Sequence, residues 1–261
     1  MGKPEDELLE VRLEGDVAVM TLNNPQRLNA LNWAMRTAMY ERLLELEAND
    51  TCRAIVLTGA GGNFCAGGDI SEMERRPVSV GRARADVAVR IFRKLVGGPK
   101  PFICAVEGHA AGAGVSFVAA SDYAVAASNA RFSCAFIKVG LIPDFGALWS
   151  LPRKVGHRKA MELCALAEAF DAQSALGMQL INRVCAPGRA LTEALEIAGR
   201  FAQAPALAMA LLRSALNTGG ETVEAAGATE VSFQSVLQDT GDFAEAVRAF
   251  TEKRRPRFTG P

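Results

Sequence analysis

One carboxylate stands in an apolar stretch of the chain, and it is the first residue whose type and setting suggest chemistry. Asp144 lies in the segment GLIPDFGALW, residues 140–149. Burial among apolar side chains raises the pKa of a carboxylate, which can then serve as a general acid and base near neutral pH. The same residue could instead cap a helix that begins near Gly146, because Asp after Pro is common at helix starts. The local residues leave both roles open.

Two glycine-rich segments could bind the negative charge that such chemistry creates. Residues 55–70, IVLTGAGGNFCAGGDI, and residues 102–117, FICAVEGHAAGAGVSF, each predict a buried strand, a glycine loop and a helix. Glycine lets backbone N–H groups approach a ligand, and a helix N-terminus adds partial positive charge. Two converging loops of this kind would bind an oxyanion, whereas the alternative is a pair of tight turns. Neither loop has the pattern of a phosphate-binding loop or of a dinucleotide site.

The cysteines and histidines indicate neither a metal site nor a nucleophile. The six cysteines contain no CxxC pair, and the two histidines, His109 and His157, form no HExxH motif. We therefore expect reduced packing thiols, among them Cys65 beside the first glycine loop, and no bound metal. His109, in the second loop, is expected to be a packed or a loop histidine rather than a catalytic one.

The amino-acid composition and the net charge limit which classes of binding partner are expected. The 261 residues are 49% hydrophobic, which is ample for a core, and 29 basic residues balance 29 acidic ones. Neither nucleic acid nor an anionic membrane is expected as the main partner. The acidic N-terminal segment, residues 1–11, lacks the apolar stretch of a signal peptide, and no apolar run reaches the ~20 residues of a membrane span. We therefore expect a cytoplasmic protein.

Alternating strands and helices are predicted to hold the loops and the carboxylate. Residues 11–23 predict two strands around a turn at residues 14–16, and further strands are expected at residues 122–128 and around 131–140. The helical spacing of Met35, Met39, Leu43 and Leu46 predicts one buried helix face. Further helices are predicted at residues 85–98, closed by glycines, and at 115–121. After Pro152 the chain is predicted to be mostly helical, so the fold class is α/β with a helical C-terminal region.

Five segments, taken in order, resemble the crotonase superfamily, which contains enoyl-CoA hydratases and isomerases. They are NNPQRLNALN, NFCAGGDISEM, EGHAAGAG, GLIPDFGALWSLPRKVG and FTEKRRPRFTG. The resemblance runs from Val11 to Gly260. It implies a crotonase-like spiral of ββα units at residues 1–200 and a helical trimerisation region at residues 201–261. It also implies an acyl-CoA substrate, no cofactor other than the coenzyme A of that substrate, and a homotrimer or a hexamer built as a dimer of trimers.

The resemblance further implies residue roles by motif position. The two backbone N–H groups of the oxyanion hole fall on Gly68 and Ala113. Residues implied to contact coenzyme A or the acyl group are Arg27, Ala30, Ala66, Asp69, Ile70, Phe136 and Lys253. Lys253 would reach the site from an adjacent subunit. Solvated surface roles for Arg27 and Lys253 stay open, and so does a helix-capping role for Asp69.

The chain departs from the hydratase pattern at both catalytic glutamates, whose motif positions hold Ser116 and Phe136. These side chains cannot replace an acid–base pair near neutral pH. Asp144 instead matches the single acidic residue of the isomerase branches, including the type that isomerises a ring-epoxide acyl-CoA in phenylacetate breakdown. We therefore expect an enoyl-CoA isomerase with Asp144 as its base, in fatty acid metabolism or phenylacetate degradation. A hydratase-like lyase with an unidentified acid–base group and a non-catalytic acyl-CoA-binding scaffold remain alternatives.

Overall fold

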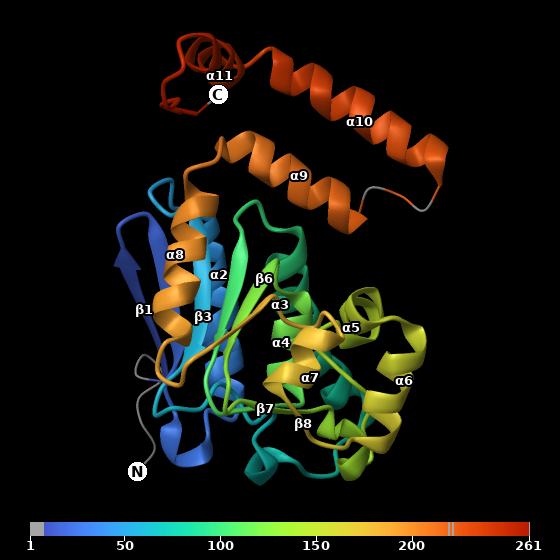
Figure 1. Ribbon diagram of the computed structural model, residues 1–261. Coiled ribbons are helices and arrows are strands. Elements are labelled where there is room, and N and C mark those ends of the chain that lie inside the picture. Colours follow the sequence, from blue (N-terminus) through green and yellow to red (C-terminus); the bar gives the residue numbers. More distant parts are fainter. Residues whose placement is uncertain (1–7, 219, 221, 261) are drawn as a thin grey trace.

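A computed structural model of the chain describes residues 8–218, 220 and 222–260 (Figure 1). Residues 1–7, which hold most of the acidic N-terminal segment and the start of the predicted core, lie outside the described part. So do residues 219, 221 and 261 of the predicted C-terminal region. The boundary at residue 200 between these two regions stays a prediction.

A six-stranded sheet forms the centre of the molecule. Its strands, in spatial order, are β1 (Leu9–Glu14), β2 (Val17–Leu22), β3 (Ala54–Gly59), β4 (Phe102–Val106), β6 (Tyr123–Ala127) and β9 (Arg183–Cys185). β1 pairs antiparallel with β2 around the predicted turn, and all later neighbours pair parallel. β3 and β4 are buried along almost their whole length, as expected for parallel strands covered on both faces.

A second, small sheet lies beside the glycine loops. It contains β5 (His109–Ala111), β7 (Arg131–Ser133) and β8 (Phe170–Asp171). The strand predicted around residues 131–140 is only partly correct, because it ends at Ser133 and Ala135–Val139 form the 3-10 helix η3. Gly140, with a left-handed backbone (φ +72°), closes η3 and turns the chain toward Asp144.

Helices cover both faces of the large sheet. The helices before residue 203 are α2 (Trp33–Ala48), α3 (Val78–Gly97), α4 (Ala113–Ala120), α5 (Ala147–Val155), α6 (His157–Leu166), α7 (Ala172–Gly177) and α8 (Ala190–Ala202), with 3-10 helices η1 (Pro25–Arg27) and η2 (Ile70–Glu72). Of these, α5 packs on α4, and α6 packs on α5. The predicted buried face of α2 is confirmed at all four positions. α3 begins seven residues before its predicted start and ends, as predicted, at the glycines. The alanine stripe of α8 packs against Val56, Ile103 and Val125 on the face opposite α2.

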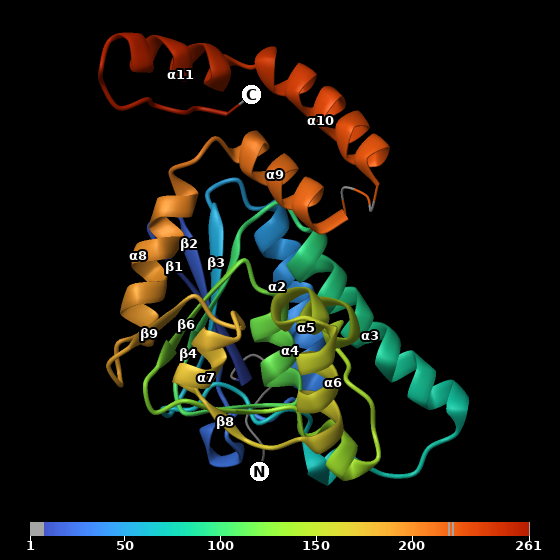
Figure 2. The ribbon, with the colours of Figure 1, turned by 45° about the vertical axis from the view of Figure 1, so that its right-hand side comes forward.

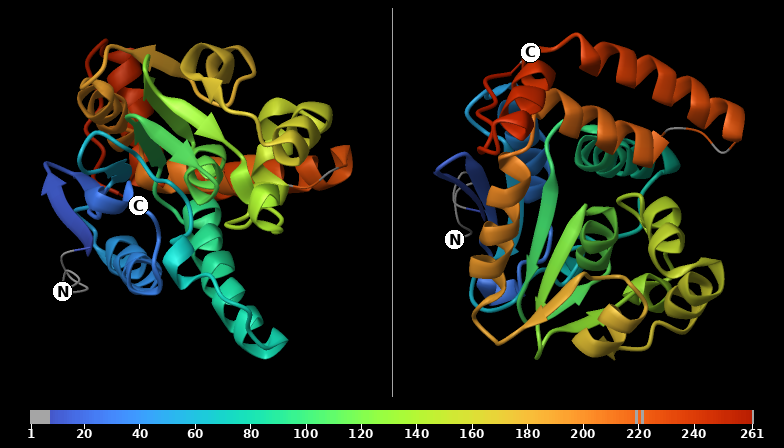
Figure 3. Two further views of the ribbon diagram at one scale, coloured as in Figure 1. Left: turned by 90° about the horizontal axis from the view of Figure 1, so that it is seen from below. Right: turned by 45° about the horizontal axis from the view of Figure 1, so that its top comes forward.

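The C-terminal region is helical, as predicted, and part of it extends away from the sheet. It contains α9 (Ala206–Thr218), α10 (Val223–Gln238) and α11 (Gly241–Thr251). The stretch 222–250 forms two helices because Thr240 begins a new one, its side chain accepting a hydrogen bond from the N–H of Phe243. Figures 2 and 3 show α10 and α11 at one end of the molecule, with α9 between them and the sheet.

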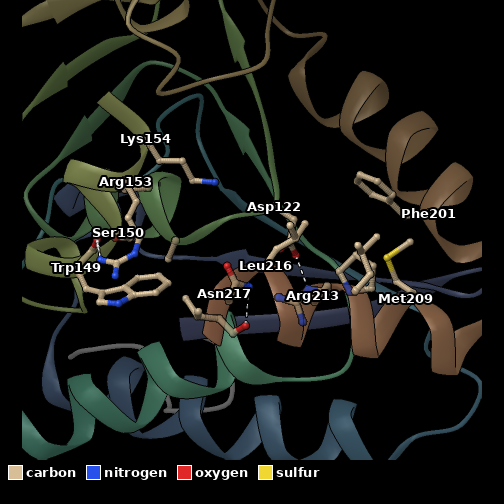
Figure 4. A pocket seen from close by; sticks show the side chains of 15 residues that line it. Asp122, Trp149, Ser150, Arg153, Lys154, Phe201, Met209, Arg213, Leu216 and Asn217 are labelled. Atoms are coloured by element: carbon tan, nitrogen blue, oxygen red, sulfur yellow. Dashed lines mark hydrogen bonds and ion pairs between the residues drawn. The ribbon is translucent and has the colours of Figure 1, made fainter. Parts of the chain in front are cut away.

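A buried arginine fixes α9 to the rest of the molecule. The Arg213 side chain donates to Asp122 at 2.8 Å (Figure 4). It also donates to the carbonyls of Leu95 (2.7 Å) and Gly98. Arg213 and Asp122 line a cavity of about 400 Å³ beside α9. Of the described helices, none alone is long and apolar enough to cross a membrane, although α8 and α9 together reach that length and composition with a bend of 107°.

Candidate active site

The two glycine loops lie side by side, joined by backbone hydrogen bonds. The N–H of Cys65 donates to the carbonyl of His109 at 2.9 Å, and the N–H of Ala111 donates to the carbonyl of Cys65 at 2.8 Å. On its other side, the first loop is held by the N–H of Leu31, which donates to the carbonyl of Gly67 at 2.7 Å. The convergence expected of the two loops is therefore present in the structure.

Glycine is required where the loops touch. Gly67 (φ +95°) and Gly112 (φ +51°) both have backbone conformations that L side chains rarely adopt. A Cβ added to Gly67 would lie 3.0 Å from the carbonyl oxygen of Ala111 and 3.5 Å from the nitrogen of Ala113. In the described part of the chain, the N–H groups of Gly68 and Ala113 donate no hydrogen bond. Ala113 is also the first residue of α4, where the helix dipole favours negative charge.

A cavity of about 620 Å³ opens beside these loops. Its walls come from the first glycine loop, from α3 and from the segment that joins η3 to α5. Most of the side chains that line it are apolar, including Leu31, Met73, Ala88, Val89, Phe136, Leu141, Ile142 and Leu148. Six charged residues also line it: Arg36, Asp69, Glu72, Arg76, Arg84 and Asp144. The shape and composition suit a ligand with an apolar group and few polar atoms.

An unusual backbone turn fixes Asp144 in this wall. The next two residues, Phe145 (φ +47°) and Gly146 (φ +75°), are both left-handed. For a phenylalanine this conformation costs about 1–3 kcal/mol, so the surroundings must hold it. The buried Phe145 ring packs edge-on against Phe117 with ring centroids 5.1 Å apart, and Gly146 lies against the ring of Phe92. The carboxylate is thereby attached to a rigid support.

The Asp144 carboxylate has a buried oxygen, Oδ1, without a hydrogen-bond partner among the described residues. Burial raises the pKa of Asp144, and the positive charge of Arg36 opposes that rise. The alternative that Asp144 caps a helix is wrong: the N-cap residue of α5 is Gly146, and among the described residues no side chain accepts a capping hydrogen bond from its first turn. The Asp144 side chain therefore remains available to a ligand.

The other two carboxylates of the cavity already have partners. Asp69 forms an ion pair with Arg27 at 2.9 Å and accepts the N–H of Ser71, also at 2.9 Å. Although burial opposes it, hydrogen bonds from Ser71 and Arg27 hold the pKa of Asp69 below its ordinary value. Glu72 accepts the N–H of Trp33 at 2.9 Å and forms an ion pair with Arg84 at 2.8 Å. The capping role considered for Asp69 is thus present.

The structure brings most of the expected site residues together. Five of them, besides Asp144, line the cavity: Ala66, Gly68, Asp69, Ile70 and Phe136. Arg27 does not line it but is joined to its wall through Asp69, and Ala30 is buried next to Leu31. Lys253 follows α11, which lies at the end of the molecule formed by the C-terminal helices (Figure 1), and does not line the cavity within this chain.

Residues considered for secondary roles have ordinary surroundings. Ser116 is fully buried, and its hydroxyl donates to the carbonyl of Gly112 at 3.4 Å. His109 has an exposed side chain and does not line the cavity. Burial raises the pKa of the Cys65 thiol to about 12, so this thiol is a packing group and not a nucleophile. No group of three or more potential metal-ligating side chains occurs within the described residues.

Arg36 is a cavity residue that sequence reasoning missed. It follows the buried Met35 on α2, where a charged side chain beside an apolar stripe is ordinarily solvated. In the structure its guanidinium lies instead 5.3 Å from the centroid of the Phe145 ring, which places it in the wall of the cavity. Only its proximity in sequence to the motif NNPQRLNALN could have drawn attention to it.

Comparison with known proteins gives consistent results. A sequence model described as enoyl-CoA hydratase/isomerase matches residues 12–261. The 1,2-epoxyphenylacetyl-CoA isomerase of Escherichia coli (strain K12) is 36% identical over 259 residues, which cover 97% of this chain and 99% of that protein. The short-chain-enoyl-CoA hydratase of Clostridium acetobutylicum is 36% identical over 244 residues, covering 93% and 94%. The crystal structure of an enoyl-CoA hydratase from Polaromonas sp. JS666 has a TM-score of 0.91 at 35% identity, covering 96% of this chain and 99% of that one.

Proposed function

The chain belongs to the enoyl-CoA hydratase/isomerase family and has the crotonase fold, and from this premise we propose that it is an enoyl-CoA isomerase with Asp144 as its single acid–base group. Enzymes of this family act on acyl-CoA thioesters. Because relatives named isomerase and relatives named hydratase match at the same identity, the choice between the two reactions depends on the site.

The observation that carries the proposal is the state of the carboxylates in the cavity. Asp144 has a buried oxygen without a partner in the described part of the chain, whereas Asp69 and Glu72 are both engaged in ion pairs. Hydration adds water across a double bond and is served best by two acid–base groups, while isomerisation moves one proton and needs one. The motif positions of the two hydratase glutamates hold Ser116 and Phe136, neither of which can act as a base. One free carboxylate therefore favours isomerisation.

The reaction follows from these groups. The Asp144 carboxylate takes a proton from C2 of a 3-enoyl thioester, and the electrons of the broken C–H bond move into the thioester carbonyl. The N–H groups of Gly68 and Ala113 bind the resulting dienolate oxygen, in a cavity where most walls are apolar and such bonds are strong. The protonated Asp144 then returns the proton at C4, which leaves the double bond between C2 and C3.

The remaining assignments concern coenzyme A and the assembly. We assign the coenzyme A part of the substrate to the surface formed by Arg27, Ala30, Ala66, Asp69 and Ile70. We also propose a trimer or hexamer in which Lys253 of a second copy completes that surface. Strongly exposed apolar side chains on the C-terminal helices support the assembly, because Leu216, Val223 and Phe250 are 79%, 85% and 87% exposed.

The test is double-bond migration in a 3-enoyl-CoA, followed with wild type and with Asp144→Asn, beside hydration of a 2-enoyl-CoA. Loss of the acid–base group is expected to lower kcat by about 10²–10⁴-fold without abolishing acyl-CoA binding. Asp69→Asn serves as the control for loss of a cavity carboxylate, and should change KM more than kcat. Rapid hydration that persists in Asp144→Asn would refute the proposal and favour a hydratase.

A further inference from the structure

The guanidinium of Arg36 lies between the proposed oxyanion hole and the proposed base, and the reaction as described does not use it. A Cβ added to Gly68 would lie only 3.0 Å from its Nη2 atom. On the other side, the guanidinium carbon is 5.3 Å from the centroid of the Phe145 ring, next to Asp144. Arg36 therefore borders the part of the cavity where the first carbons of an acyl group must lie.

The hydrogen-bonding capacity of this guanidinium is largely unused. Its Nε donates one long bond, 3.4 Å, to the carbonyl of Leu31. For Nη1 and Nη2 the structure contains no acceptor among residues 8–218, 220 and 222–260, and no carboxylate there lies within ion-pair distance of Arg36. An arginine has five N–H donors, and Arg36 lines the cavity, so most of its donors are unpaired within the described part of the chain and lie beside the space that a ligand would fill.

A second arginine of the same cavity shows the contrast. Arg84 forms an ion pair with Glu72 at 2.8 Å and stacks over the ring of Trp33, with its guanidinium carbon 4.7 Å from the ring centroid. Its charge is thus matched within the protein. Arg36 has an aromatic ring beneath it, but its Nη1 and Nη2 have no acceptor among the described residues, so a ligand atom is the missing partner.

The apolar walls of the cavity make the unpaired donors of Arg36 unfavourable when a hydrocarbon ligand is bound. The neighbouring walls are apolar side chains of α3 and of the segment before α5, such as Val89, Ile142 and Leu148. An all-hydrocarbon acyl group that fills the cavity would displace water from the Arg36 donors and return no hydrogen bond, which is unfavourable. An acyl group with an oxygen at this place would accept a charge-assisted hydrogen bond instead.

We propose that Arg36 is a specificity-determining residue, which selects acyl-CoA thioesters whose acyl group carries an oxygen acceptor close to the carbons that Asp144 serves. The inference rests on the proposed function only for the placement of the acyl group in this cavity. A hydrogen bond to a charged donor corresponds to a preference of about ten- to hundred-fold for the oxygenated ligand over its hydrocarbon counterpart.

The test measures binding and needs no turnover. Calorimetry compares pentanoyl-CoA with 3-hydroxypentanoyl-CoA and 4-oxopentanoyl-CoA, which lack a double bond to migrate and place an oxygen at two neighbouring carbons. Wild type should bind at least one oxygenated ligand about tenfold or more tightly than pentanoyl-CoA. Arg36→Met should reduce this preference to near unity. The matched control Arg84→Met, which removes a paired arginine of the same cavity, should keep it.

Two outcomes would overturn the inference. One is equal affinity of wild type for all three ligands, and the other is a preference that survives in folded Arg36→Met. A loss of affinity for all ligands by the same factor would likewise show that Arg36 acts on coenzyme A binding and not on the acyl group. Because none of these ligands reacts by proton transfer to C4, the outcome is independent of whether Asp144 catalyses isomerisation.

Discussion

The close contact between the two glycine loops makes Gly114→Ala a direct test of the oxyanion hole. Gly114 is a buried residue of α4 without a positive φ, so alanine does not strain its own backbone. The added Cβ would lie 2.4 Å from the carbonyl oxygen of Cys65. To reach even the 3.0 Å below which real Cβ contacts are essentially absent, the loops must separate by at least 0.6 Å.

Separating the loops would also separate the two N–H groups that are proposed to bind the thioester oxygen. The carbonyl of Cys65 lies three residues before Gly68, and Gly114 follows Ala113, so the two N–H groups move apart with the loops. A misplacement of about 1 Å costs about 10²-fold in rate, and loss of one such donor costs about 10²–10³-fold. We therefore predict a fall in kcat of about 100-fold, or about 2.7 kcal/mol. Overpacking should also lower stability by about 1–3 kcal/mol.

The assay is steady-state isomerisation of a 3-enoyl-CoA, with thermal unfolding of each variant measured alongside. Gly199→Ala is the matched control, because Gly199 lies in the helix α8 and a Cβ there meets nothing within 4 Å beyond its chain neighbours and the backbone of its own helix. It should keep wild-type kcat and gain about 0.5–1 kcal/mol of stability. If folded Gly114→Ala keeps kcat within threefold of wild type, the spacing of the two loops does not control the rate, and the reasoning fails.

Four further predictions concern charge and burial. Burial raises the pKa of Asp144, and the base must be ionised to take a proton, so kcat/KM should decrease as the pH is lowered through a value above the ordinary aspartate pKa of 3.8. A decrease that begins only at or below pH 3.8 would contradict the burial of Asp144. Because its pKa is raised by folding, the neutral form of Asp144 is better accommodated in the folded state than the charged form. Its contribution to folding stability is therefore lost as the pH rises through the pKa of the folded state. Asp144→Asn should therefore be more stable than wild type at pH 7 in urea denaturation. Arg213→Met leaves Asp122 without its buried partner and should lower the free energy of unfolding by about 3 kcal/mol. Arg248→Met, at an exposed ion pair, should lower it by only about 0–1 kcal/mol. Equal losses of stability in the two variants would contradict the role of Arg213 in holding α9. The Cys65 thiol, buried and with its pKa raised to about 12, should resist alkylation at pH 8 until the chain unfolds, as mass spectrometry would show.

The sequence predicted those parts of the fold that have a regular pattern. The β1–β2 hairpin and the buried face of α2 follow from the spacing of apolar residues, and both are confirmed. β8 and β9 were not predicted, because strands of two or three residues are too short to show a period. The segment 131–140 contains enough β-branched and aromatic residues to resemble a strand, yet it turns into η3 after Ser133. The 3-10 turn there depends on tertiary contacts that local sequence does not reveal.

For the site, the resemblance of five ordered motifs to the crotonase superfamily predicted the cavity-lining residues better than the types of neighbouring residues did. Asp144 alone would have been read as a helix cap, and only the tertiary structure excludes that role. The left-handed backbone of Phe145 could not be predicted, because a phenylalanine adopts it only when its ring is anchored by neighbours such as Phe117. Arg36 was missed for a related reason: the direction of a long side chain at the edge of an apolar stripe is decided by packing against a distant loop.

The central claim is that Asp144 is the one base of the site, and exchange of the C2 protons with solvent deuterium tests it most directly. Exchange is followed by NMR in D₂O with a 3-enoyl-CoA, using wild type, Asp144→Asn and Asp69→Asn, each shown by calorimetry to bind the ligand. The account predicts rapid removal of a C2 proton in wild type and in Asp69→Asn, seen either as deuterium incorporation or as direct transfer of the proton to C4, and removal at the uncatalysed rate in Asp144→Asn. Exchange at the wild-type rate in folded, ligand-binding Asp144→Asn would contradict the account, since another group would then remove the proton.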